Sequence, residues 1–289
     1  MKKWRKEDKG KEMRINDNKI IYLNLKKDTI KINTIENIII GINFVKLFLI
    51  KFLIIINYLN QIKSNISLFK NAKISLKIKG VGESIILSDE FDNKYYPNKV
   101  YINGIKENII SNTYFFNQTD NFVELIWDDK LNNCEYMFYR CYKITEIDLS
   151  NFNTSNITSM LGIFYECSSL TSINLSNFDT SKVIDMYAMF YGCSSLISVD
   201  LTNFDTSQVT DMNGMFEECS SLTSLDLTNF DTSQVTDMNS MFYGCKSLTS
   251  LDLSIFNTSK VTDMENMFGF CPLLTSLDLY ILILHRFRL

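Results

Sequence analysis

Hydrophobic positions recur along the second half of the chain with a period of 26 residues. A Met-Phe pair, replaced once by Ile-Phe, marks each copy at residues 137, 163, 189, 215, 241 and 267. The clearest copy begins at Met215 and reads MFEECSSLTSLDLTNFDTSQVTDMNS. Five copies are complete, and a sixth stops matching after Leu279. A fixed period of this length predicts that each copy forms one coil and that successive coils stack.

Within one copy, the apolar residues fall on three segments. Leu222, Leu225 and Leu227 form the pattern L-x-x-L-x-L, and the alternation from Ser224 to Thr228 predicts a strand with Leu225 and Leu227 facing the core. Residues 229–233 carry side chains that bond their own backbone and favour a turn. A second arc and a closing corner follow, the corner expected as a short helical turn, and the inward residues there are Val235, Met238, Met241, Phe242 and Cys219. Stacking places like residues above one another at about 4.8 Å.

These residues resemble the BspA-like leucine-rich repeat of bacterial surface proteins, in the variant written around MFxxCxSLTSLDLSNFDTSxVTDM. The resemblance covers residues 137–279, and a half-copy precedes it in which Leu131, Cys134 and Met137-Phe138 take the Val, Met and Met-Phe places. It implies an α/β or mainly β fold, a leucine-rich-repeat-like right-handed solenoid with a parallel β-sheet. It also implies a surface-exposed or secreted adhesin or binding protein of a microbe, and it carries no catalytic residue.

Residues 73–130 have the pattern of a small antiparallel β cap domain. Five short strands are expected, with the sequences ISLKIKG, ESIILS, KVYING, NTYFF and NFVELIW, separated by turn residues. The last strand, which ends at Trp127, is expected to lie against the first repeat. Such a unit would cover the apolar end of the stack, as repeat proteins require for solubility.

An N-terminal apolar helix is expected at residues 37–60, after a basic polar segment at residues 1–36. Residues 38–59 are long enough to cross a bilayer, although Lys46 and Lys51 would each cost about 2.5–3.5 kcal/mol at mid-span. One interpretation is a membrane anchor that leaves the N-terminus in the cytosol and the repeats outside. The alternatives are an amphipathic or packed helix, or sequence upstream of the true start.

The repeat pattern also breaks near the other end of the chain. The solenoid is expected over residues 131–280, with an atypical tail at residues 281–289. After Leu279 the expected SNFDTS is replaced by YILILHRFRL. Either residues 280–284 cover the last coil as an apolar lid, or the array is a piece of a longer one.

Charge and composition narrow the function classes. The net charge of −4 hides an asymmetry, because residues 137–280 carry five Lys and Arg against seventeen Asp and Glu, a net −12. This half would repel a phosphate backbone, so nucleic acid is not an expected partner. The single histidine, His285, lies in the tail, which removes the commonest general base from the body of the protein. No nucleophile-base constellation or phosphate loop is recognisable, so neither an enzyme nor a cofactor is expected.

Cysteines recur at the repeat period. Side chains that project in parallel from stacked coils do not point toward one another, which disfavours disulfides. A ladder of buried thiols is therefore expected, because free cysteine packs as a small apolar residue. The seven cysteines lack a CxxC pair, which argues against a zinc site. The cysteines of the ladder are Cys141, Cys167, Cys193, Cys219, Cys245 and Cys271.

The candidate ligand-binding face is the outward column of the predicted strands: Glu146, Asp148, Asn174, Ser198, Asp200, Ser224, Asp226, Ser250, Asp252 and Asp278. A second acidic column follows the turn at Asp185, Asp211, Asp237 and Asp263. Stacked carboxylates repel by roughly 1 kcal/mol per close pair in water. A basic or polyhydroxylated partner or loosely held calcium would relieve this repulsion; the alternative is a solvated face copied by duplication. No metal site is assigned.

Together these features predict a non-enzymatic recognition or adhesion protein. Its partner would be a protein or glycan ligand, with basic ligands among the candidates, bound through the repeat sheet. The expected location is the cell surface, through an anchor at residues 38–59, or the secreted fraction. The alternative is a cytoplasmic leucine-rich-repeat scaffold for protein–protein interaction, which would follow if residues 38–59 do not insert.

Overall fold

The computed structural model describes residue 51, residues 53–57 and residues 72–277, with side chains described as far as Thr275. The chain divides into two units, residues 1–70 and 71–289. In the first unit, Lys51 and residues 53–57 are helical and exposed. The remainder of the predicted apolar helix and the tail at residues 281–289 lie outside the described residues. No helix among the described residues has the length and apolar character needed to span a bilayer.

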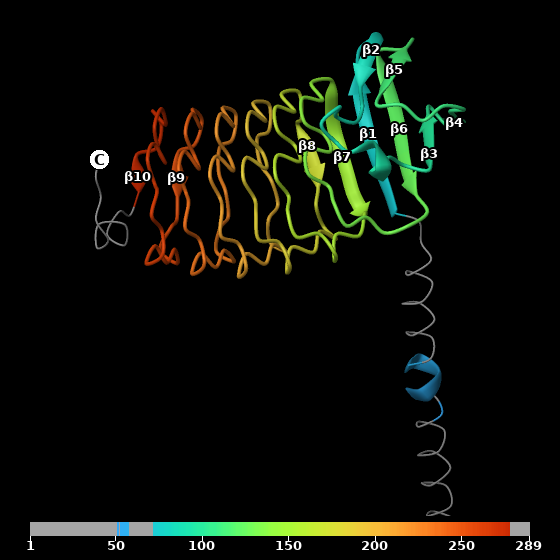
Figure 1. The fold of residues 1–289 in the computed structure, drawn as a ribbon. Coiled ribbons are helices and arrows are strands. Elements are labelled where there is room, and N and C mark those ends of the chain that lie inside the picture. The colour runs from blue at the N-terminus through green and yellow to red at the C-terminus, as the bar shows by residue number, and fades with distance from the viewer. Residues whose placement is uncertain (1–50, 52, 58–71, 278–289) are drawn as a thin grey trace, which may run out of the picture. The chain divides into compact units, whose positions relative to one another are not determined.

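The second unit begins with the antiparallel β unit that the sequence predicts (Figure 1). Its strands are β1 (Ala72–Lys79), β2 (Gly82–Ile85), β3 (Lys99–Ile102), β4 (Ile105–Lys106), β5 (Thr113–Phe116) and β6 (Asp120–Trp127), with a 3-10 turn, η1, at Asn93–Tyr95. β1 pairs with β6, β6 with β3, β3 with β4 and β2 with β5, all antiparallel. Alternate residues of β1 and β6 are buried, as their period-two pattern requires.

The strand that joins this unit to the repeats is not the expected one. The order in the six-stranded sheet is β4-β3-β6-β1-β7-β8, so β1 and not β6 lies beside the first repeat strand, β7 (Ile144–Asn151). β6 is central because β1 and β3 pair on either side of it. Trp127, at its end, reaches the repeats only through its ring, which lies 5.8 Å from that of Phe152.

The repeats form a stack of coils joined to this sheet (Figure 1). β7 pairs in parallel with β8 (Ser172–Asn174), and β9 (Ser250–Leu251) pairs in parallel with β10 (Ser276–Leu277). A row of parallel bridges also crosses the second arc, linking Ser159, Asp185, Asp211, Asp237 and Asp263 in turn. The described chain is therefore mainly β, with a mixed sheet and almost no helix.

The predicted strands of the third and fourth coils are not regular strands. A ladder of backbone hydrogen bonds was expected between these two segments. One bond of this kind is the Thr223 N–H donating to the Ile197 carbonyl at 3.1 Å. The rings of Phe178, Phe204 and Phe230, which follow these segments, are 6.3 and 6.5 Å apart. These rings stack from coil to coil, but the backbone that precedes Phe204 and Phe230 forms no regular strand. β7 is long because β1 pairs with its other edge.

The closing corner is a series of turns and not the expected helical turn. Two residues in each corner have positive φ, such as Gly214 and Glu218 at 61° and 55° in the copy that begins at Met215. Left-handed residues break a right-handed helix. This backbone conformation lets N–H groups of the corner donate hydrogen bonds to carbonyl groups of the next coil. Gly214 donates to Asn239 and Phe216 donates to Met241, each at 2.9 Å.

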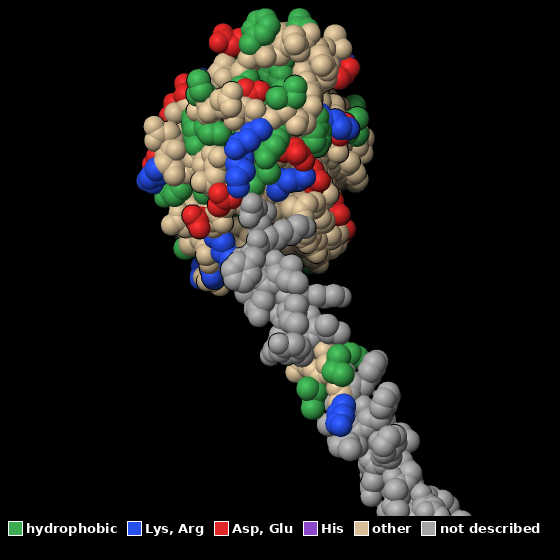
Figure 2. Space-filling model, turned by 90° about the vertical axis from the view of Figure 1, so that its right-hand side faces the viewer, with side chains coloured by type: hydrophobic (Ala, Val, Ile, Leu, Met, Phe, Trp, Pro, Cys, Tyr) green, Lys and Arg blue, Asp and Glu red, His purple; other side chains and the backbone are tan. Residues whose placement is uncertain are grey.

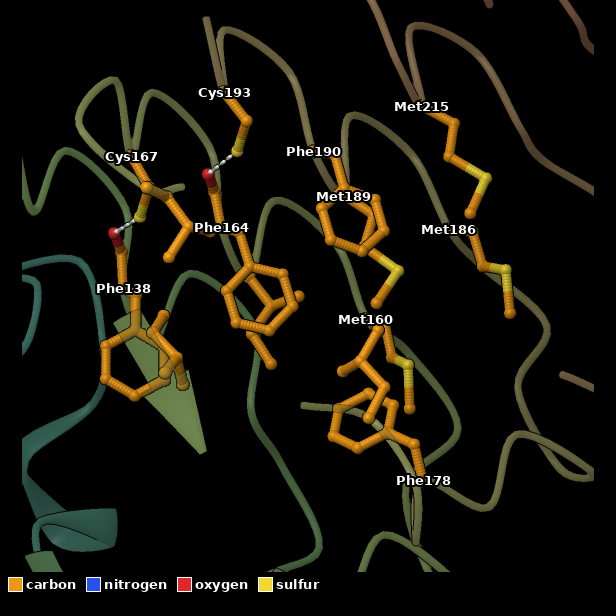
Figure 3. Close-up of a cluster of buried hydrophobic side chains, with 14 of the residues drawn as sticks. Phe138, Met160, Phe164, Cys167, Phe178, Met186, Met189, Phe190, Cys193 and Met215 are labelled. Carbon is orange, nitrogen blue, oxygen red and sulfur yellow. Dashed lines mark hydrogen bonds between the residues drawn. The ribbon is translucent and has the colours of Figure 1, made fainter. Parts of the chain in front are cut away.

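The core consists of several rows of stacked side chains that run from coil to coil. The inward residues Val235, Met238, Met241 and Phe242 are fully buried, whereas Leu225 is only partly buried. Phenylalanine rings of the corner stack from coil to coil at 5.3 to 6.0 Å. Figure 3 shows this row beside the methionines and the cysteines. Burying such rows stabilises the stack at roughly 25 cal/mol per Å² of apolar surface.

The cysteine ladder is confirmed. The seven cysteines are free thiols, and Cys134, Cys141, Cys167, Cys193, Cys219 and Cys245 are buried. Each thiol from the second corner onward donates a hydrogen bond to the phenylalanine carbonyl of the preceding coil, as Cys167 does to Phe138 at 3.1 Å and Cys193 to Phe164 at 3.2 Å (Figure 3). Burial raises the pKa of these thiols, to about 12 for Cys167 and Cys219.

Candidate functional site

The outward column splits into two parts in the structure. Glu146, Asp148 and Asn174 lie on β7 and β8 beside the cap. The later members lie on the more irregular side of the stack and are exposed: Ser198, Asp200, Ser224, Asp226, Ser250 and Asp252. Asp278 lies outside the described residues.

The aspartates of the later part form the turn that follows them. The Asp226 Oδ1 atom accepts the Thr228 N–H at 3.0 Å and the Thr228 hydroxyl at 2.7 Å. These hydrogen bonds lower the pKa of Asp226, and the same contacts from Thr202 lower the pKa of Asp200. An Asp or Asn at this position therefore has a structural task, because its side chain replaces a backbone acceptor in the turn.

The second acidic column forms the bridge ladder of the second arc. Each of its members accepts the backbone N–H two residues later, as Asp211 does from Asn213 at 2.9 Å. Burial raises the pKa of Asp185 and Asp211, and for Asp211 the neighbouring Asp185 and Asp237 raise it further. The predicted repulsion between stacked carboxylates is thus present here.

Two adjoining hollows open on the polar face of the sheet where the cap meets the repeats. Their volumes are about 400 and 610 Å³, and Lys77, Phe122 and Glu146 line both. The smaller hollow extends over Asp148 and Asn174. We call this surface the junction groove; it is also lined by Lys73, Ser75, Lys79, Asn103, Asp120, Asn121, Thr145, Asn151, Thr171 and Ser172.

Charges in the junction groove are arranged as pairs across strands. The Lys73 ammonium lies 2.5 Å from the Glu124 carboxylate, and the Lys77 ammonium lies 2.7 Å from Glu146. At the cap end, Figure 2 likewise shows basic and acidic side chains among hydrophobic ones, with no large field of one sign. A surface of this kind offers both donors and acceptors, and it suits a polar ligand better than a highly charged one.

The backbone of β7 is irregular beside this groove. Its register against β1 shifts between Lys73 and Ser75, and again between Lys77 and Ile78. Such bulges bend a strand and re-aim its side chains, and they are frequent next to binding sites. The exposed ring of Phe122 on β6 adds apolar contact surface to hollows that Leu76, Ile78 and Ile147 also line.

Of the groove residues, only Glu146, Asp148 and Asn174 were predicted from the sequence; the missed ones include Lys73, Ser75, Lys77, Lys79 and Phe122. The signal was present in residues 73–79, KISLKIK, where every second side chain is polar and so shares one face of a strand. What the sequence did not contain was the pairing of β1 with β7, which places that face beside Glu146 and Asp148.

The described residues hold no cluster of three or more His, Cys, Asp or Glu side chains arranged to bind a metal ion. The groove residues supply amide, hydroxyl, ammonium and carboxylate groups around one aromatic ring. This arrangement can bind and orient a polar ligand.

Comparison with known proteins gives a family for the chain. No curated protein and no solved structure matches it. The profile of one protein family matches residues 102–197 and residues 170–276, which together are more than half of the sequence. The chain therefore belongs to the family described as "Mycoplasma protein of unknown function, DUF285".

Proposed function

We propose that this protein is a non-enzymatic recognition protein that binds a protein or glycan ligand in the junction groove. In this proposal the stack is a right-handed solenoid of the BspA-like leucine-rich-repeat type. The 26-residue period, the buried rows and the parallel bridges between coils support that assignment. The cap and the repeats then form one binding surface.

The observation that carries the proposal is the groove itself. It is the place on the polar sheet face where hollows, a backbone bulge and an exposed aromatic ring coincide. Ligand sites are concave and combine apolar contact area with a few placed polar groups. Asp148 and Asn174 make the same turn bond as the distal aspartates, so the hollows, and not the turn bonds, favour the cap-proximal part of the predicted face over the distal part.

The ligand class follows from the charge pairs. Lys73 and Lys77 already have carboxylate partners, so a strongly charged ligand would have to break these pairs. A neutral oligosaccharide, or a protein loop rich in hydroxyl and amide groups, can bond to both members of each pair. Its apolar face can pack on Phe122, whose side chain is exposed.

Binding to panels of purified glycoproteins and neutral oligosaccharides tests the proposal. The wild-type chain is compared with Phe122→Ser and Lys77→Gln in the groove, and with Asp252→Asn at the distal end as a matched control. We expect at least one ligand whose affinity falls about tenfold in both groove variants, a loss of about 1.4 kcal/mol, and is unchanged in the control. Equal affinity in all four proteins would contradict the groove as the site.

Surface display is the second part of the proposal, and it rests on the apolar segment at residues 38–59. Protease treatment of intact cells tests it directly. Cleavage of the repeats by external protease is the expected result. Repeats that resist the protease until the cells are opened would instead favour an intracellular scaffold with the same groove.

A further inference from the structure

A second surface lies on the closing corners and is rich in tyrosine. Tyr139, Tyr165 and Tyr191 stack in consecutive coils with ring centroids 4.7 and 4.3 Å apart. Tyr136 packs edge-on against Tyr139 at 5.5 Å, and Tyr187 is 40% exposed beside them. We call these five residues the tyrosine patch. Tyrosine is enriched where proteins meet other proteins, because it buries a large area at a small cost in side-chain entropy.

The fold does not require tyrosine at these outward positions. The place of Tyr187 is taken by Asn213 and Asn239 in the next two coils, and the N–H of each makes the same bond to the aspartate two residues before it. The place of Tyr191 is taken by Glu217 in the following coil. The patch is thus confined to the first three corners, although the same backbone repeat continues into the later coils.

The first corner of the patch contains an arginine of the chain itself, Arg140, and its contacts show how a guanidinium can bind there. The Arg140 guanidinium lies over the Tyr139 ring at 4.9 Å. Its Nε atom donates to the Glu166 carboxylate of the next coil at 2.9 Å. Cation–π contact and a charge-assisted hydrogen bond therefore act on the same side chain.

Two coils further on, the same arrangement recurs without its arginine. Tyr191 and Glu218 stand 52 residues after Tyr139 and Glu166, and Gly192 stands at the place of Arg140. Tyr191 stacks on Tyr165 on one side, and the next residue in its column is Glu217 and not another ring. Among the described residues, Glu218 pairs with Lys246 at 3.4 Å, and no ion pair joins a basic side chain to Glu217.

We propose that an arginine side chain of a partner protein occupies this position, with its guanidinium over Tyr191 and bonded to Glu217, beside the Lys246–Glu218 ion pair. The rest of the tyrosine patch then packs against apolar parts of the partner. The carboxylates Glu135 and Asp185 lie close enough to Tyr136 to act on its pKa, so the border of the patch is acidic and complements a basic segment. This surface is independent of the junction groove.

The position equivalent to Arg140 is a glycine with left-handed backbone. Gly192 has a φ of 67°, and a Cβ atom there would lie 3.1 Å from the Glu166 Cγ atom. Arg140 has a similar φ of 58° at the equivalent place. Gly192→Arg therefore adds a side chain at a strained backbone position that Arg140 also occupies, requires a small shift of Glu166, and would supply a guanidinium from the chain itself.

Peptide titration tests the inference, with a short fluorescent peptide that contains two arginines and its analogue with citrulline. The full chain is compared with Gly192→Arg, Glu217→Gln and Tyr187→Asn, and with Tyr243→Gln as a matched tyrosine outside the patch. We expect the arginine peptide to bind at least about tenfold more tightly than the citrulline peptide. Gly192→Arg should abolish the binding, and the other two patch variants should weaken it about three- to tenfold.

Several outcomes would overturn the inference. These are no binding of the arginine peptide at about 1 mM, equal binding of the citrulline peptide, or full binding by Gly192→Arg. Sedimentation of the same proteins could give a further outcome that overturns the inference. Self-association that is lost in Tyr187→Asn would mean that the patch binds a second copy of this chain and not an arginine-bearing partner.

Discussion

The hydroxyl of Thr180 bonds both backbone groups of Asp205 in the next coil. It accepts the Asp205 N–H at 2.7 Å and donates to the Asp205 carbonyl at 2.9 Å. Thr154 makes the same pair of bonds to Asp179. One buried side chain thus takes the place of a strand partner at each coil, where the backbones do not pair directly.

Thr180→Val should destabilise the protein by about 1–3 kcal/mol, because two buried backbone groups lose their partner. Thr258→Val is the matched control. The Thr258 hydroxyl is buried and has no hydrogen-bond partner among the residues that the structure describes, so its removal should be neutral or slightly stabilising. Urea unfolding of both variants measures the difference, and equal losses would show that the hydroxyl bonds do not hold the coils together.

The buried thiols predict sensitivity to alkali. The pKa of Cys219 is raised to about 12 in the folded protein, whereas an unfolded thiol titrates near 8.5. Between these values the unfolded chain loses protons that the folded chain keeps, so stability is complete below about pH 8.5 and falls as the pH rises toward 12. Each such thiol contributes up to about 1.4 kcal/mol per pH unit.

Urea midpoints at pH 7, 9 and 10 check this prediction. Cys219→Ala should be less stable than the wild type at pH 7 but should lose less stability between pH 9 and pH 10. Thiol labelling is the second readout. Cys271 is only half-buried, so it should react first in the native protein; rapid labelling of all seven thiols would contradict the ladder.

Residues with positive φ in the closing corners predict opposite effects on stability when a side chain is added and when one is removed. Gly214 and Ser240 occupy equivalent places with φ of 61° and 54°. Gly214→Ala should destabilise by about 1 kcal/mol, because a Cβ atom is unfavourable at positive φ. Ser240→Gly should be neutral or stabilising for the same reason. Thermal unfolding of the two variants measures both signs, and a more stable Gly214→Ala would refute the assignment.

Replacing an outward aspartate by asparagine or by alanine should affect the stability of the protein differently. Asp226→Asn should keep the turn, because an amide oxygen can accept the Thr228 N–H as Asn174 accepts that of Ser176. Asp226→Ala should lower the unfolding temperature. Since the turn bonds lower the pKa of Asp226, its contribution is present above the unfolded pKa of about 4 and is lost as the pH falls. An Asp226→Ala variant that matches the wild type at pH 7 would contradict this role.

The sequence predicted those features of the fold that the repeat pattern determines. The inward rows, such as Val235, Met238 and Phe242, and the thiol ladder follow from residues that recur with one spacing and therefore share one environment. The antiparallel cap strands were also predicted, because alternation and turn residues bound them.

Other features depended on contacts between distant segments. The pairing of β1 with β7 and the position of the groove could not be read from any local pattern. The helical turn expected at the corner was wrong, because the left-handed position of Glu218 carries glycine in only two of its copies, Gly192 and Gly244, and so gives a weak signal in the sequence. The regular strand expected at residues 222–228, with its equivalent in the third coil, was likewise wrong, since alternation specifies the face that each side chain takes and not the backbone pairing between coils.

The fold and both proposed binding surfaces require coils of 26 residues that stack in register, and deletion of one coil tests this directly. Removal of residues 189–214, one full period, joins Ala188 to Met215 and leaves the cap and the junction groove intact. This variant should fold cooperatively with a lower unfolding temperature, whereas removal of residues 189–201, half a period, should leave the protein unfolded. Circular dichroism and thermal unfolding that fail to separate the two deletions would contradict the stack.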